Sequence, residues 1–156
     1  MVALPIFAFL PVLSFGQATP ALSSCFGKDF PAYEAVLGKA SERNVDSLAE
    51  DRIYRGKHNG SVCLRKEKHA KVVTTLLVLY PKGNIGWRQA LRTIGVRTDD
   101  ARLTKKSGYF MISGCKGIPT GWMVWWQTNV DGTGQSELSL GVAHRIVYSS
   151  SSPARG

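Results

Sequence analysis

Histidine is the side chain best suited to acid–base chemistry near neutral pH, and this chain has three of them. They are His58, His69 and His144. The alternating pattern of residues 137–148 places His144 on an otherwise apolar strand face. Beside an acid such as Asp131, Glu137 or Asp99, it would act as a general acid or base in a cleft. A core histidine that is simply hydrogen-bonded explains the same pattern, so His144 is the candidate catalytic residue of a secondary hypothesis.

No motif strengthens the enzymatic interpretation. The chain has no G-x-S-x-G nucleophile elbow, no H-E-x-x-H and no P-loop. The cysteines and histidines lack the close spacing of a zinc site, so neither a metal nor a cofactor is expected. The enzyme alternative is a small nuclease-like hydrolase, or a cyclase or isomerase, with His144 in its cleft.

Positive charge is concentrated in two segments. The 156 residues include 20 Lys and Arg against 11 Asp and Glu, a formal net charge of +9. Residues 28–51 are net acidic, whereas residues 52–71 and 82–106 are strongly basic. Such segments attract anionic polymers, glycans or membrane surfaces. The predicted anion-binding residues are Arg65, Lys66, Lys68, Lys71, Arg88 and Arg92.

This charge has two other interpretations, and the sequence argues against the first. Sequence-specific nucleic-acid recognition is not expected, because no helix-turn-helix, zinc-finger or RNP-type motif is present. The basic segments would also serve only to keep the protein soluble if it were a partner-specific inhibitor domain.

The first 18 residues are typical of an export signal. Residues 1–15 are apolar and uncharged, and Gly16-Gln17-Ala18 provides small residues for cleavage after Ala18. The usual Lys or Arg before the apolar run is missing, and a buried N-terminal element or a lipobox ending at Cys25 are the alternatives. The prediction is a secreted or extracellular protein, or a periplasmic one in a bacterium.

Export makes a disulfide bond the expected state of two of the three cysteines. Cys63 and Cys115 are the preferred pair, because both are expected at strand edges, and pairing of Cys25 with either one stays open. Asn59 begins an N-glycosylation sequon, Asn59-Gly60-Ser61, in a segment rich in turn-forming residues.

The pattern of apolar residues, caps and turns predicts a single α+β domain over residues 19–148, followed by a disordered tail, 149–156. Apolar spacing and caps predict helices at 29–40, 45–55 and 85–94. Strands are predicted at 61–66, 71–80, 109–113, 122–130 and 137–148, with a loop at 96–107. Short links imply antiparallel pairing. The expectation is two N-terminal helices and one mid-chain helix packed on a mostly antiparallel sheet of about five strands.

The predicted strand 122–130 contains three tryptophans, which are divided between its two faces. Trp122 and Trp126 are predicted on the apolar face and Trp125 on the opposite one. Core packing is the favoured role of Trp125, and a platform for stacking a sugar or a base is the alternative. Taken together, the sequence predicts a small secreted basic protein that acts as a non-enzymatic effector or binding factor for an anionic or cell-surface partner.

Overall fold

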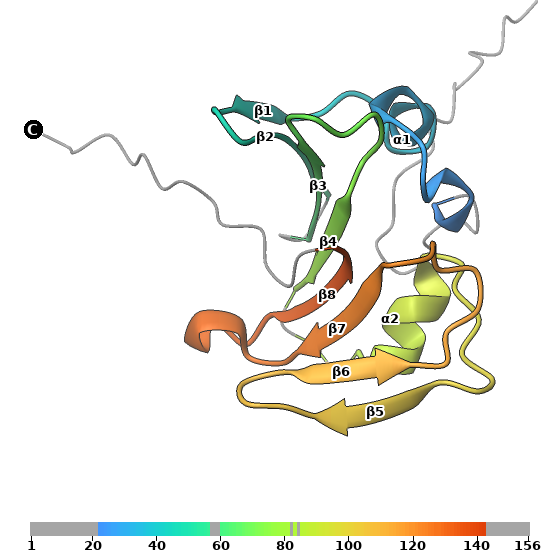
Figure 1. Cartoon of the computed structure of the whole chain (residues 1–156). Coiled ribbons are helices and arrows are strands. Elements are labelled where there is room, and N and C mark those ends of the chain that lie inside the picture. The colour runs from blue at the N-terminus through green and yellow to red at the C-terminus, as the bar shows by residue number, and fades with distance from the viewer. Residues whose placement is uncertain (1–21, 57–59, 82, 84, 143–156) are drawn as a thin grey trace, which may run out of the picture.

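The protein forms one eight-stranded antiparallel sheet in the order β1-β2-β3-β4-β8-β7-β6-β5 (Figure 1). The computed structural model describes residues 22–56, 60–81, 83 and 85–142. The predicted signal segment 1–18, the sequon residue Asn59, the candidate catalytic residue His144 and the tail 149–156 lie outside the described residues.

Two meanders of four strands each build this sheet. The first contains β1 (Glu42–Val45), β2 (Ala49–Arg55), β3 (Ser61–Glu67) and β4 (Thr75–Tyr80). The second contains β5 (Arg102–Lys105), β6 (Phe110–Ser113), β7 (Met123–Gln127) and β8 (Ser136–Gly141). Antiparallel pairing of β4 with β8, with Thr75 opposite Gly141, joins the two meanders into one sheet.

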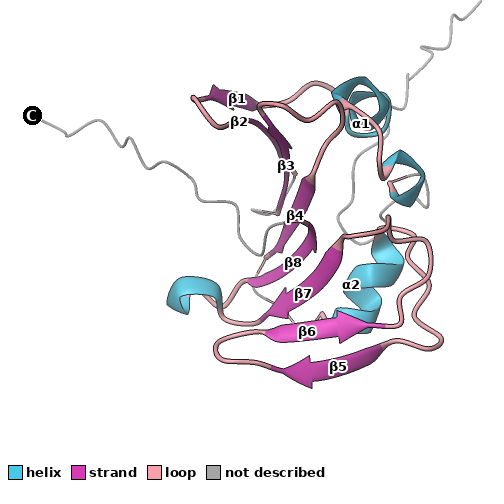
Figure 2. Ribbon diagram, viewed as in Figure 1, coloured by secondary structure: helices cyan, strands magenta, loops and turns pink. Residues whose placement is uncertain are grey.

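Helical segments cover one face of the sheet, as Figure 2 shows. The helix α1 (Phe30–Leu37) begins after Asp29, whose carboxylate accepts a hydrogen bond from the Phe30 N–H. The helix α2 (Trp87–Thr93) links the two meanders, and the single turn η1 (Ser23–Cys25) precedes α1. A second short turn, η3 (Val130–Gly132), connects β7 to β8.

The main core lies between this face and the helices. Alternate strand residues point into it, including Leu76 and Val78 of β4 and Leu138 of β8, and Phe30 of α1 and Leu91 of α2 pack against them. The Tyr80 hydroxyl donates a hydrogen bond to the Ala90 carbonyl, with 3.1 Å between the oxygens. Burial raises the pKa of Tyr80 to about 12.

The opposite face is buried at its centre as well. Ile53, Cys63 and Leu77 form a small second cluster there. Trp125 lies on this face and Trp126 in the main core, which confirms the prediction that these two side chains occupy opposite faces of the strand. Trp125 is only 4% exposed, and a side chain so deeply buried offers no open platform for stacking a ligand.

The expected α+β architecture is wrong, because the described residues contain eight strands and only two α-helices. The main error is the helix predicted at 45–55, where the chain instead turns between β1 and β2. The Asp46 carboxylate accepts hydrogen bonds from the Leu48 and Ala49 N–H groups, which fixes this turn. From Ala49 onward the residues alternate across a strand that pairs with β3 along its whole length. The apolar spacing that mimics a helix is therefore overridden by non-local strand pairing.

A smaller error concerns residues 96–107. Their polar composition predicts a loop, yet residues 102–105 form the edge strand β5. Edge strands accept charged side chains because one face and one edge contact water. The helices predicted at 29–40 and 85–94 and the five predicted strands do form, although most are shorter than expected within the described residues.

The predicted disulfide between Cys63 and Cys115 is also wrong, since none of the three cysteines forms a disulfide bond. Cys63 is fully buried in the cluster on the face away from the helices. Cys115 packs against the main core on the helical side. The two thiols therefore lie on opposite sides of the sheet. The sequence places both cysteines at strand edges, but this position does not specify which face of the sheet each side chain occupies.

Candidate anion-binding surface

Most acidic side chains of this protein are already neutralised by cations close to them. All eleven belong to the described residues, and seven form ion pairs there, namely Asp29, Glu34, Glu42, Glu50, Asp51, Glu67 and Asp100. Their partners are Arg43, Arg52, Arg55, Arg65, Lys66 and Lys116. Apart from the Asp100–Lys116 pair, these contacts lie in the first meander and α1. The acidic segment noted in the sequence therefore neutralises five of the basic residues of its own half.

Arg65, predicted to bind anions, is one of the neutralised cations. Its Nε lies 3.3 Å from Oδ1 of Asp51 on the face away from the helices, and the side chains are only 12% and 11% exposed. Neither of these two atoms has a hydrogen bond with good geometry, so the contact is a charge pair only. Burial raises the pKa of Asp51, although the Arg65 charge opposes the rise. Arg65 is therefore part of the protein interior.

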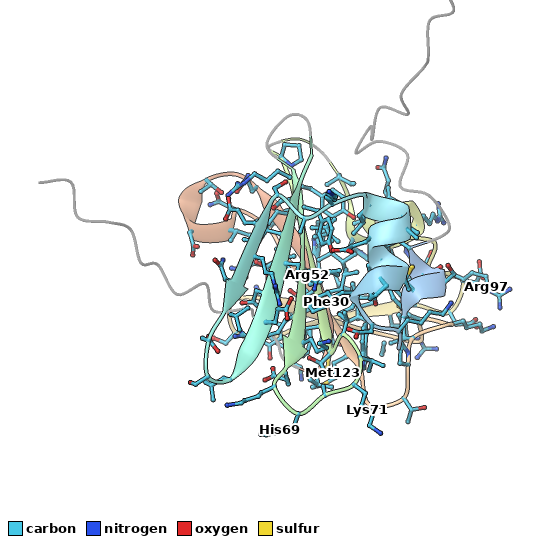
Figure 3. The ribbon with its side chains drawn as sticks, turned by 90° about the horizontal axis from the view of Figure 1, so that it is seen from above. Phe30, Arg52, His69, Lys71, Arg97 and Met123 are labelled. Atoms are coloured by element: carbon cyan, nitrogen blue, oxygen red, sulfur yellow. The ribbon has the colours of Figure 1, made fainter. Side chains whose placement is uncertain are left out.

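Lys66 points to the other face, toward α1. Its Nζ donates to both carboxylate oxygens of Asp29, at 2.8 and 3.0 Å. Burial raises the pKa of Asp29, but hydrogen bonds from Lys66 and the Phe30 N–H outweigh it, and the pKa falls below its ordinary value. Both Lys66 and Arg52 contact the Phe30 ring: Nζ of Lys66 lies 4.9 Å from the ring centroid, and the Arg52 guanidinium lies 4.0 Å from it. Figure 3 shows Phe30 beside Arg52. Lys66 thus holds α1 on the sheet, which is a structural role.

The other predicted cations are exposed. Lys68 and Lys71 lie in the loop between β3 and β4, and Figure 3 shows the tip of this loop, with His69 and Lys71, projecting from the molecule. Arg88 and Arg92 lie one turn apart on α2, and both are exposed. The predicted set of six is therefore divided among the two faces of the sheet, one loop and one helix.

Arg88 has a clear positioning role besides its charge. Its guanidinium donates to the carbonyls of Thr98 and Ala101, at 2.7 and 3.0 Å, and stacks on the Trp87 ring at 4.3 Å. These contacts hold the segment before β5 against α2. They also place Arg88 close to Arg97 and Arg102, because Thr98 follows Arg97 and Ala101 precedes Arg102 in the chain.

Ten cations of the described residues are exposed and have no acidic partner within 4 Å. They are Lys28, Lys39, Lys68, Lys71, Arg88, Arg92, Arg97, Arg102, Lys105 and Lys106. Six of them, which we call the α2–β5 cations, belong to α2, β5 and the adjoining segments: Arg88, Arg92, Arg97, Arg102, Lys105 and Lys106. The sequence prediction names only Arg88 and Arg92 of this group. The net charge of residues 82–106 was the signal that could have found the other four.

Two features of the described residues bear on the enzyme alternative. Among the described residues, no group of three or more Cys, His, Asp or Glu side chains could hold a metal ion. The Ser139 hydroxyl donates to Oε1 of Glu137 at 2.9 Å, but both side chains are buried. In the part of the chain that the structure describes, no helix has the length and apolar character needed to cross a membrane.

Comparison with models of protein families, with curated proteins and with solved structures gives no match to this chain. The residues and their geometry are therefore the whole basis for a functional proposal.

Proposed function

We propose that this protein is a non-enzymatic binding protein that holds an anionic partner through the α2–β5 cations. The observation that carries the proposal is the uneven use of charge: the acids pair with five cations of the first half of the domain, while all six α2–β5 cations are exposed and have no acidic partner within 4 Å. Exposed cations that form no ion pairs release counterions when an anionic polymer binds, which supplies most of the affinity of such complexes.

The rigid placement of several of these cations supports the same function. Arg88 fixes the segment before β5 through two carbonyl hydrogen bonds, so that Arg97 and Arg102 start from a defined backbone. Cations whose backbone is already ordered lose less conformational entropy when they bind a ligand. Secretion, which the first 18 residues predict, would bring such a surface to sulfated glycans, acidic polymers and lipid headgroups outside the cell.

Retention on heparin across a salt series tests the proposal. The variant Arg92→Gln/Arg102→Gln should elute at clearly lower salt, and the slope of log affinity against log salt should fall by about two. The matched control Arg43→Gln/Arg55→Gln removes the same charge from side chains that are 61% and 62% exposed and already paired. The control should elute close to the unmodified protein, because both arginines are already paired with carboxylates. It should also stay folded, because ion pairs this exposed contribute little to stability. Equal losses in both variants would show that only net charge matters, and no salt-dependent retention at all would refute the proposal.

A further inference from the structure

Exposed apolar side chains gather at one end of the sheet. The chain reverses at this end between β1 and β2 and between β3 and β4, and β8 ends there where β7 begins. Among the described residues, five large hydrophobic side chains are exposed, and four of these lie at this end. The four are Val45 (64% exposed), Leu48 (69%), Met123 (44%) and Val142 (50%). We call them the apolar end.

Backbone contacts place these residues around the β3–β4 loop. The Lys68 N–H donates to the Leu48 carbonyl at 2.7 Å, and the Val142 N–H donates to the Thr74 carbonyl at 3.0 Å. Met123 is the register partner of Gly141, the residue before Val142. The turn that carries Leu48 is fixed by the Asp46 carboxylate, which accepts two backbone N–H groups. Ordered backbone on both sides of the β3–β4 loop thus keeps these apolar side chains exposed to solvent.

Cations lie among these apolar residues. Lys68 and Lys71 are exposed in the loop, and Figure 3 shows His69, Lys71 and Met123 on the same side of the molecule. Arg102, one of the α2–β5 cations, begins β5 at the same end, opposite Ser113. The two carboxylates nearest the loop are engaged, because Asp46 accepts its turn hydrogen bonds and Glu67 lies 3.9 Å from Nε of Arg65.

We propose that the apolar end docks on the surface of an anionic lipid bilayer. The inference rests on the proposed function and names its partner. Lysines near a negatively charged membrane attract its headgroups, while apolar side chains beside them enter the boundary between headgroups and acyl chains. An anionic polysaccharide or a nucleic acid would be bound by the cations alone and would leave the exposed Leu48 and Val45 without a role.

Sedimentation of the full-length protein with lipid vesicles tests the proposal. Vesicles of phosphatidylcholine alone should bind weakly, and vesicles that also contain phosphatidylglycerol should bind strongly. Val45→Thr/Leu48→Ser should weaken binding to the mixed vesicles about tenfold, because it removes apolar surface that would leave water. Lys68→Gln/Lys71→Gln should weaken it about 25-fold, about fivefold for each lysine.

Two controls separate this inference from the proposed function. Leu103→Thr changes an exposed apolar residue of β5 that points to the helical face, and its vesicle binding should not change. Val45→Thr/Leu48→Ser should keep its retention on heparin, because no charge is removed. Vesicle binding that is absent in a protein retained by heparin, or that survives Val45→Thr/Leu48→Ser, would overturn the membrane inference and leave the proposed function standing. Failure to bind either probe would refute both.

Discussion

Removing one member of the Asp51–Arg65 pair is expected to destabilise the protein more than removing both. At 3.3 Å between Oδ1 and Nε, the attraction is about 5 kcal/mol for an effective dielectric constant of about 20. Burial of both groups opposes this gain. The pKa of Asp51 is raised by burial, and the charges of Asp46 and Glu67 raise it further, despite the attraction of Arg65. The pair as a whole therefore adds little net stability.

Asp51→Val leaves a buried guanidinium without its counter-charge, and Arg65→Met leaves a buried carboxylate. Each is expected to cost about 3 kcal/mol, whereas Asp51→Val/Arg65→Met should lie within about 1 kcal/mol of the unmodified protein. The resulting coupling, about 5 to 7 kcal/mol, is as large as the attraction worked out from the distance or somewhat larger. Urea unfolding followed by circular dichroism at neutral pH measures all four proteins.

The pH dependence provides a second measurement on the same pair. In Arg65→Met, the folded-state pKa of Asp51 rises further, so its contribution to stability is present below the unfolded pKa and lost as pH rises through the folded pKa. Relative to the unmodified protein, the unfolding free energy of this variant should therefore increase as the pH falls from neutral toward the ordinary pKa of an aspartate. Additive losses in the double variant, or an Arg65→Met protein whose stability falls over that pH range, would refute the reasoning.

Two further predictions concern backbone space and thiols. Gly141→Ala should cost more than about 3 kcal/mol in urea unfolding, because its Cβ would lie 2.4 Å from the Thr74 carbonyl oxygen at a φ of +149°. Gly132→Ala, at a φ of +73° with open space around it, should cost about 1 kcal/mol, and equal costs would contradict the account. Titration with a thiol reagent should find three thiols in denaturant. In the native protein Cys115 should react first, because it is the least buried of the three, and finding only one thiol in denaturant would disprove the free state.

Local pattern was sufficient for the elements whose neighbours agree with it. The strand at 71–80 is apolar on both alternating faces, and β4 is indeed buried on both sides because β3 and β8 flank it and helices cover one face. Apolar spacing and caps predict the helix at 29–40, and α1 indeed begins after an Asp29 cap, with Pro31 in its first turn. In both cases the local preference and the tertiary environment act in the same direction.

The segment at 45–55 shows where local pattern fails. Its apolar residues fit a helical stripe, but the same residues also fit a strand that places Ala49, Asp51 and Ile53 on one face. The choice depends on β3, which pairs with the whole of β2. Sequence periodicity does not include the free energy of pairing with a partner strand that lies beyond the next turn.

The binding surface divides in the same way. Composition and the order of charges along the chain are enough to show that the protein is basic, that six of its eleven acids lie in residues 28–51, and that residues 82–106 carry excess cations. Which cations remain exposed depends on the folded chain: Arg65 is largely covered and paired with Asp51, and Lys66 holds α1, whereas Lys68 and Lys71 face water. The reason is that the strand pairing of β2 with β3 selects which charges meet, and charge energies depend on distance and burial that no linear spacing specifies.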